Sequence, residues 1–242
     1  MRMAVTWGYE MHELADAMDA VRNRILASAP PGRGISRPLL EEFPAGGAHM
    51  VAGPTVGIIG TTDPRNEANH NAGRFGEMFG GRTLTLPHFA FYEEAYGREA
   101  RLAADEALTA HWDHLDIAVA TCDELSTRFG AGSGVPWPPA LLEEMRPDSV
   151  GEFGGMYLTA SGGEALSGAY LRIGMNRRQF ARVARSGGSV LLAGAQARRL
   201  GPALAALRGG LVSALVTDLD FAWGLLRAHA GDDAAGAGER AA

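Results

Sequence analysis

The chain has 242 residues, a formal net charge of −6 and 22 basic side chains, all of them arginine, since the sequence contains no lysine. An acidic chain is not expected to bind nucleic acid by itself, because counterion release requires a basic face. The sequence has no apolar run of about 18 residues and no secretion signal. These features exclude a membrane span and predict a cytoplasmic protein.

The content of reactive residues excludes several kinds of chemistry. Cys122 is the single cysteine, so an internal disulfide and a multi-thiolate metal site are both excluded. The absence of lysine excludes the phosphate-binding lysine of the P-loop and catalysis through a Schiff base. We therefore expect neither a cofactor nor a metal, and interpret Cys122 as a small buried apolar residue.

Apolar segments rich in β-branched residues recur along the chain and predict strands. They are Met3–Trp7, Thr55–Ile59, Thr83–Leu86, Leu115–Ala120, Tyr170–Ile173, Val190–Ala193 and Leu211–Thr217. Two of them, TVGII and VLLA, are continuously apolar, as is typical of strands covered on both faces.

Segments that predict helices lie between the predicted strands, from apolar spacing in the first and from composition and flanking turns in the others. They are Glu10–Ala27, Asn66–Phe79, Glu99–His111, Arg177–Arg185, Pro202–Leu207 and Leu219–Ala230. The alternation of strand and helix predicts an α/β fold of three layers, with a mostly parallel sheet and helices on both faces.

Composition predicts one folded domain over residues 1–230, with no break large enough to divide it. Within it, Ala27–Gly53 is rich in proline and is expected to be irregular, and Gly130–Pro139 is expected to form a loop. The tail Gly231–Ala242 lacks large apolar residues and is predicted to be disordered.

The loop Gly60-Thr61-Thr62-Asp63 comes directly after a predicted buried strand and before a predicted helix. Open α/β sheets bind ligands at the carboxyl ends of their strands, and helix N-termini favour phosphate. The alternative is a helix cap formed by Thr62 or Asp63, and a loop of this kind can serve both purposes.

Charged residues follow or precede other predicted strands. Asp218 ends LVSALVT and either points into the same crevice or caps the last helix. Arg198 and Arg199 follow VLLA, and Arg82 precedes Thr83–Leu86. These arginines either bind a phosphate through two hydrogen bonds or are solvated surface charges.

The segment His111-Trp112-Asp113-His114 brings two imidazoles and a carboxylate together. These residue types can bind a metal, but the segment precedes a predicted strand and so lies on the side away from the crevice. Favourable placement of histidine at a helix C-terminus is the alternative explanation, and we prefer it.

Several motifs together resemble the sugar-binding (effector) domain of SorC-type bacterial transcriptional regulators. The longest is VLLAGAQARRLGPALAALRGGLVSALVTDLDFAWGLL at Val190–Leu226. Supporting segments are Val5–Gly8, Asp148–Glu152 and Asn69–Pro87, in the family's order. This resemblance implies a fold similar to that of ribose-phosphate isomerase and glucosamine-phosphate deaminase.

The resemblance also implies a ligand-binding crevice for a sugar or phosphosugar, with an arginine at the family's lysine position. The residues it assigns to this crevice are Gly60, Thr61, Thr62, Arg82, Asp123, Glu124, Glu152, Arg198 or Arg199, and Asp218. Departures from the family's motifs, such as Thr121-Cys122-Asp123 in place of a G-I-G turn, leave the identity of the ligand open.

Family members carry an N-terminal helix-turn-helix, which this chain lacks, so DNA binding is expected only through such a segment elsewhere. The leading hypothesis is a non-catalytic effector domain that forms a homodimer or homotetramer, whose geometry the ligand changes. One alternative is a sugar-phosphate isomerase or deaminase of the same fold, with carboxylates as acid and base. Another is a purely structural oligomerisation module.

Overall fold

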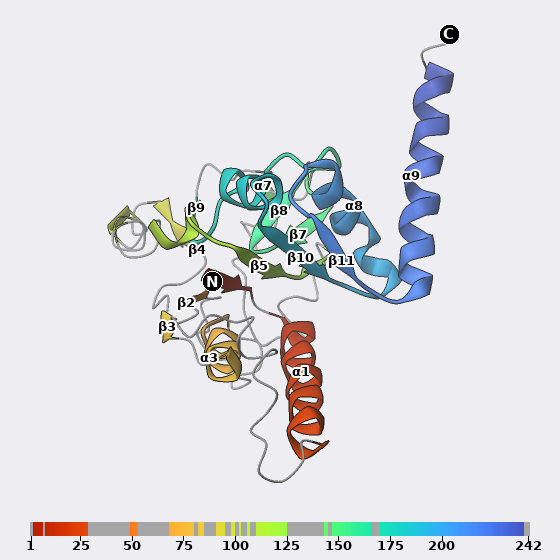
Figure 1. Ribbon diagram of the computed structural model, residues 1–242. Helices are drawn as coiled ribbons and strands as arrows, with labels where there is room; N and C mark the ends of the chain where they lie inside the picture. The colour runs from red at the N-terminus through yellow and green to blue at the C-terminus, as the bar shows by residue number, and fades with distance from the viewer. Residues whose placement is uncertain are drawn as a thin grey trace.

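The computed structural model describes residues 2–6, 8–28, 49–52, 68–79, 82–84, 91–94, 98–99, 102, 106, 110–124, 143–144, 147–165 and 170–239. This part of the chain is built around a six-stranded parallel sheet (Figure 1). Its strands in spatial order are β11 (Ala214–Val216), β10 (Ser189–Ala193), β5 (Ile117–Ala120), β1 (Arg2–Val5), β2 (His49–Ala52) and β3 (Arg82–Leu84). Because every pairing is parallel, the carboxyl ends of the strands lie at one edge.

Helices cover both faces of this sheet, as the sequence predicts. On one face lie α1 (Tyr9–Ser28) and α3 (Ala68–Phe79), and on the other α7 (Arg177–Arg185) and α8 (Leu200–Arg208) (Figure 1). The last helix, α9 (Leu219–Glu239), packs against α8. Among the described residues, no helix is long and apolar enough to cross a membrane.

Alternate side chains of each central strand enter two separate cores, because successive residues of a strand point to opposite faces. In β1, Met3 and Val5 pack with the buried residues Met11 and Phe75 of α1 and α3. The residue between them, Ala4, belongs to the other core, which contains Phe180 of α7. Both faces of β1 are therefore buried, as expected for a central strand of a parallel sheet.

The start of α7 shows how local sequence sets a helix boundary. The Asn176 side chain accepts a hydrogen bond from the Gln179 backbone N–H (3.0 Å), and the Gln179 side chain accepts one from the Asn176 backbone N–H (2.9 Å). This reciprocal pair is a capping box, which satisfies two backbone donors at the helix start. The helix begins at Arg177, as the sequence analysis expects.

Two small antiparallel sheets flank the large one, and the sequence does not predict them. The first joins β6 (Cys122–Asp123), β7 (Gly151–Phe153) and β8 (Met156–Leu158). Gly154 and Gly155 form the β7–β8 turn with φ of 57° and 82°, which favours glycine at both positions. The second sheet pairs β4 (Phe91–Glu93) with β9 (Tyr170–Arg172).

Three sequence-based expectations require correction. The second strand of the large sheet is His49–Ala52, inside the segment expected to be irregular, whereas Thr55–Ile59 lies outside the described residues. Tyr170–Arg172 is a strand, but it pairs with β4 and not with the large sheet. The tail predicted to be disordered from residue 231 is helical through Glu239, as a continuation of α9, since adding a residue to an existing helix is easier than starting a new one.

The remaining predicted elements agree with the structure. The strands Leu115–Ala120, Val190–Ala193 and Leu211–Thr217 correspond to β5, β10 and β11. The predicted helix Glu99–His111 is helical at each of its positions that the structure describes, which are 99, 102, 106, 110 and 111. The loop Gly130–Pro139 lies outside the described residues.

Candidate functional site

The candidate site lies where the chain leaves β1, β5 and β10 at the carboxyl edge of the large sheet. β1 is followed by Thr6, β5 by Thr121 and strand β6, and β10 by a 3₁₀ turn, η2 (Ala197–Arg199). These three strands are neighbours in the sheet, since β5 pairs with both β1 and β10. Their exits therefore bring polar residues from distant parts of the sequence together.

Arg199 is the central charged residue of this edge. Its side chain is only 5% exposed and forms ion pairs with Glu10, in the first turn of α1, and with Asp123 in β6 (Nη2 to Oδ2, 3.1 Å). Burial lowers the pKa of Arg199, but the two carboxylates raise it by more, and the net shift is upward. The guanidinium therefore remains a cation with two anionic partners.

The two candidate arginines have different environments. Arg198 is exposed, and its Nε lies 3.6 Å from Asp123 Oδ1, whereas Arg199 is buried. Both cations thus converge on the same carboxylate. Arg199 fixes the position of Asp123, while Arg198 has the exposure that an incoming anion requires.

Asp123 and Glu152 are cross-strand partners in the β6–β7 pair. Glu152 is buried, and its Oε1 accepts a hydrogen bond from the backbone N–H of Gly155 in the β7–β8 turn. The neighbouring Glu124 is half-buried, and its backbone N–H donates to Asp123 Oδ1 at 2.8 Å. The structure therefore brings Asp123, Glu124 and Glu152 together, with Glu152 partly used in holding its own turn.

Cys122 directly precedes Asp123 in β6, pairs with Phe153 across the sheet, and has the environment of a core residue. Burial, with a smaller contribution from Glu152, raises the pKa of its thiol far above the ordinary value. A nucleophilic cysteine needs a lowered pKa, and this one is raised. The interpretation of Cys122 as a small apolar residue agrees with its position in the core.

A second polar group, which sequence reasoning missed, lies at the ends of β1 and β5. Thr6 Oγ1 accepts a hydrogen bond from the Thr121 backbone N–H (3.2 Å), and the Asn71 side-chain N–H donates to the Thr6 carbonyl (3.4 Å). Asn71 is fully buried, and its Oδ1 has no hydrogen-bond partner among the described residues. Its place in the first turns of α3, the helix after β2, is the signal that could have identified it.

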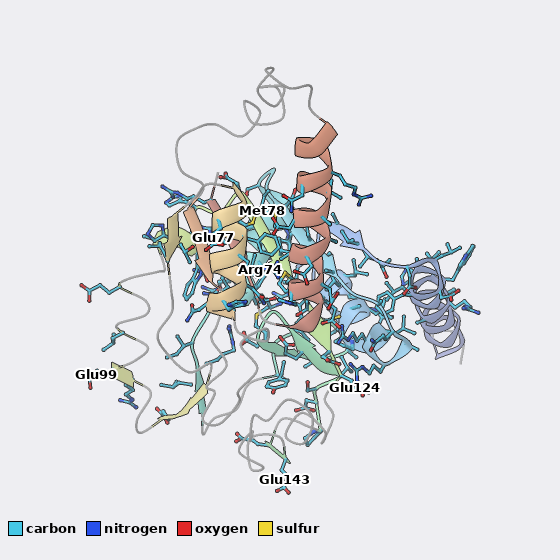
Figure 2. The ribbon with its side chains drawn as sticks, turned by 90° about the horizontal axis from the view of Figure 1, so that it is seen from below. Arg74, Glu77, Met78, Glu99, Glu124 and Glu143 are labelled. Carbon is cyan, nitrogen blue, oxygen red and sulfur yellow. The ribbon has the colours of Figure 1, made fainter. Side chains whose placement is uncertain are left out.

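Glu10 was missed in the same way, although it opens the helix that follows β1. Figure 2 shows α1 beside α3 on the same face, with Arg74 between them. Arg74 Nη2 pairs with Asp16 at 2.6 Å and Arg74 Nη1 lies 3.0 Å from His12 Nδ1, which ties the two helices together. The hydrogen bond from Arg74 lowers the pKa of Asp16. This contact supports the helices that carry Glu10 and Asn71.

Asp218 caps the last helix. Its Oδ1 accepts a hydrogen bond from the Phe221 backbone N–H at 2.7 Å, and the residue is exposed. This is the capping alternative that the sequence leaves open. Asp218 follows β11, which is separated from β5 by β10, so it stands at the margin of the polar group and not at its centre.

The other predicted site residues have separate locations. Arg82 opens β3 level with Arg2 and His49, at the amino-terminal edge of the sheet, opposite the edge that carries Asp123. Arg82 would lie at this edge even with the predicted strand start at Thr83, because a residue that precedes a parallel strand lies at its amino-terminal end. Gly60, Thr61 and Thr62 lie outside the described residues, so their assignment to the site stays a prediction.

The histidine segment at the end of the helix before β5 shows protein contacts. Asp113 Oδ1 accepts from the Gln179 side chain at 3.0 Å and lies 3.3 Å from Arg182 Nη2. In the described part of the chain, no group of three or more His, Cys, Asp or Glu residues is arranged to hold a metal ion. This segment is therefore an attachment point for α7.

Comparison with known proteins finds similar solved structures but no similar sequence family. No protein-family model matches the sequence, and a search of curated proteins finds no significant match. Among solved structures, the chain is similar to a transcriptional regulator from Streptococcus pneumoniae TIGR4 (TM-score 0.68, 16% identity, covering 95% of this chain and 79% of that one). It is also similar to a domain assigned to sugar binding in a transcriptional repressor from Vibrio fischeri (0.66, 19%, 94% and 79%).

The full-length sorbitol operon regulator SorC from Klebsiella pneumoniae is a third similar structure (TM-score 0.67, 16% identity). The match covers 93% of this chain and 65% of that one. The TM-scores of these three matches, over 93–95% of this chain, establish a common fold. The three-layer α/β architecture predicted from the sequence is confirmed.

Proposed function

We propose that this chain is a carbohydrate-binding effector domain of a sugar-responsive transcriptional regulator, acting in the cytoplasm. Three observations support the proposal. The fold is that of structures described as transcriptional regulators, one of them a sorbitol operon regulator. A polar group lies at the carboxyl edge of the parallel sheet, where open α/β folds bind small molecules. The sequence motifs in the same region resemble the SorC-type effector domain.

The observation that carries the proposal is the ordered carboxylate of Asp123 at this edge. Arg199 and Arg198 both approach it, and Glu124 follows it. A fixed carboxylate accepts hydrogen bonds from neighbouring hydroxyls, which is the chemistry that recognises a polyol. Exposed Arg198 is placed to pair with a phosphate if the sugar carries one. Ligand binding would change the geometry of the oligomer, and with it DNA binding by an attached helix-turn-helix.

The carboxylates of this region argue for binding in preference to catalysis. An isomerase or deaminase of this fold needs a carboxylate free to move a proton at the sugar carbons. Asp123 is paired with Arg199, and Glu152 accepts a hydrogen bond from its own turn. Neither group is a free base in this arrangement. The expected result of incubation with ribose 5-phosphate or glucosamine 6-phosphate is therefore no turnover.

A thermal-shift screen against sugars and sugar phosphates tests the proposal. A ligand at 100 times its Kd stabilises the folded state by about 2.7 kcal/mol, which raises Tm by about 5–10 °C for a chain of this size. Asp123→Asn should abolish that shift. Asp116→Asn is the matched control, because Asp116 precedes the same strand at the opposite edge of the sheet. Equal shifts in both variants would exclude Asp123 from the binding site, and turnover would establish an enzyme instead.

A further inference from the structure

The outward face of α9 is apolar. Leu219, Trp223 and Leu226 are 72%, 54% and 58% exposed, and their spacing places them on one stripe of the helix. The opposite face of α9 carries Phe221 and Leu225, which are buried in the core on the α8 side. The helix therefore has two apolar faces, and the fold covers only one of them. We call Leu219, Trp223 and Leu226 the α9 stripe.

The α9 stripe continues onto the neighbouring strand. Val216, at the end of β11, is 51% exposed, and β11 is the edge strand of the large sheet among the described strands. Single exposed apolar residues are ordinary on a protein surface, but a contiguous group that includes tryptophan marks an interaction surface. Figures 1 and 2 both place α9 at the margin of the molecule, away from α1 and α3.

We propose that the α9 stripe is the contact surface for a second copy of this chain, with the two α9 helices packed antiparallel. The spacing of the stripe is self-complementary. In an antiparallel pair centred between Trp223 and Leu226, each Trp223 lies level with Leu226 of the second copy, and each Leu219 with Ala230. Large side chains thus meet at the centre and a small one meets leucine at each end.

The charges beside the stripe favour the same partner. Asp220 and Arg227 are seven residues apart and lie on the same flank of the α9 stripe. A two-fold axis perpendicular to an antiparallel helix pair keeps equivalent flanks on the same side. Each Asp220 is therefore placed beside Arg227 of the second copy, and the pair occurs twice. A parallel two-fold pair would instead place equivalent flanks on opposite sides, which separates Asp220 from Arg227 of the second copy and forms neither ion pair.

The narrow width of the α9 stripe favours a reversible dimer. A standard interface covers about 800 Å² per partner, with an apolar centre and a polar rim. The α9 stripe with Val216 supplies such a centre, and Asp220 and Arg227 supply a rim. Because the apolar centre is one helix wide, we expect dissociation in the micromolar range.

Sedimentation velocity of the full chain, without any sugar, tests this proposal. Between about 1 and about 100 µM the 25.5 kDa chain should pass from monomer to dimer. The double variant W223E/L226E should remain monomeric at the highest concentration, with unchanged circular dichroism because both side chains are exposed. The matched control is V21E, an exposed apolar residue of α1, which should dimerise normally. A monomeric parent chain, or a dimer that W223E/L226E leaves intact, would overturn the proposal.

Two further variants test the antiparallel arrangement itself. D220R should weaken the dimer at least tenfold, and D220R/R227D should restore it, because the exchange re-forms both ion pairs. Under mild oxidation, a mixture of W223C and L226C chains should form a mixed disulfide in higher yield than either chain alone. Equal yields, or no restoration by the exchange, would contradict the antiparallel arrangement. The inference rests on the proposed function only where that function needs an oligomer. None of these measurements involves a sugar, so their failure is distinguishable from a failure of sugar binding, which the thermal-shift screen measures.

Discussion

Replacing Arg199 by methionine should be among the most destabilising single changes in this protein. The substitution keeps an unbranched side chain and removes the guanidinium with its charge. Glu10 and Asp123 then face each other across a buried position without the cation that now lies between them. Breaking a buried ion pair from one side costs about 3–5 kcal/mol, because a charge is left uncompensated. For a chain of this size that corresponds to a fall in Tm of about 6–20 °C.

Urea unfolding followed by tryptophan fluorescence measures this loss, since Trp112 is fully buried. Arg198→Met is the matched control, because Arg198 is exposed and its pairing with Asp123 should contribute about 1 kcal/mol at most. The triple variant E10Q/D123N/R199M should recover more than half of the loss, since it removes the charges on all three residues. A loss below about 1 kcal/mol for Arg199→Met, or no recovery in the triple variant, would refute the assignment of Arg199 as a buried ion-pair centre.

Three further predictions concern other parts of the fold. Gly162 has φ of +80° and a Cβ there would lie 2.4 Å from backbone atoms at the end of α8, so Gly162→Ala should cost several kcal/mol in urea unfolding. Gly187→Ala, with φ of +85° and open space around it, should cost only about 1–2 kcal/mol, and equal losses would contradict the clash. Burial raises the pKa of both Cys122 and Tyr157, so these groups ionise more readily in the unfolded chain. Stability should therefore fall above their ordinary values of 9.0 and 10.0, by about 1.4 kcal/mol per pH unit and group, and Tyr157→Phe should reduce this slope. Asp218→Ala should cost about 1 kcal/mol of stability as a lost cap and leave any sugar-induced thermal shift intact, whereas loss of the shift would return Asp218 to the site.

The parts of the fold that follow from the sequence are those where one physical signal dominates. The helix Arg177–Arg185 has both apolar spacing and a capping box, and its bounds match the prediction. The strand at Val190 is buried on both faces and shows as a continuous apolar run. The short strands β6, β7 and β8 have no such signal, because two or three residues are too few to display a period. These strands form because segments distant in the sequence pair with each other, and the local pattern of apolar residues does not predict them.

The sequence predicts some residues of the candidate site and misses others, for similar reasons. Asp123 and Arg199 were expected there from their positions after strands and from the family resemblance, and the structure brings them together. Sequence could not decide which of Arg198 and Arg199 is the buried one, because that depends on the turn η2 before α8. Glu10 and Asn71 were missed because a polar residue near a helix start usually serves as a solvated or capping group.

Arg199 connects three segments that are far apart in the chain. They are the first turn of α1, strand β6 of the first small sheet, and the turn η2 before α8. A small molecule that binds Asp123 in place of Arg199 breaks one of the two ion pairs. The Arg199 guanidinium then keeps only its ion pair with Glu10. Occupancy of the sheet edge would thereby change the contact between Arg199 and the first turn of α1. The guanidinium that stabilises the ligand-free protein thus also links the binding edge of the sheet to α1.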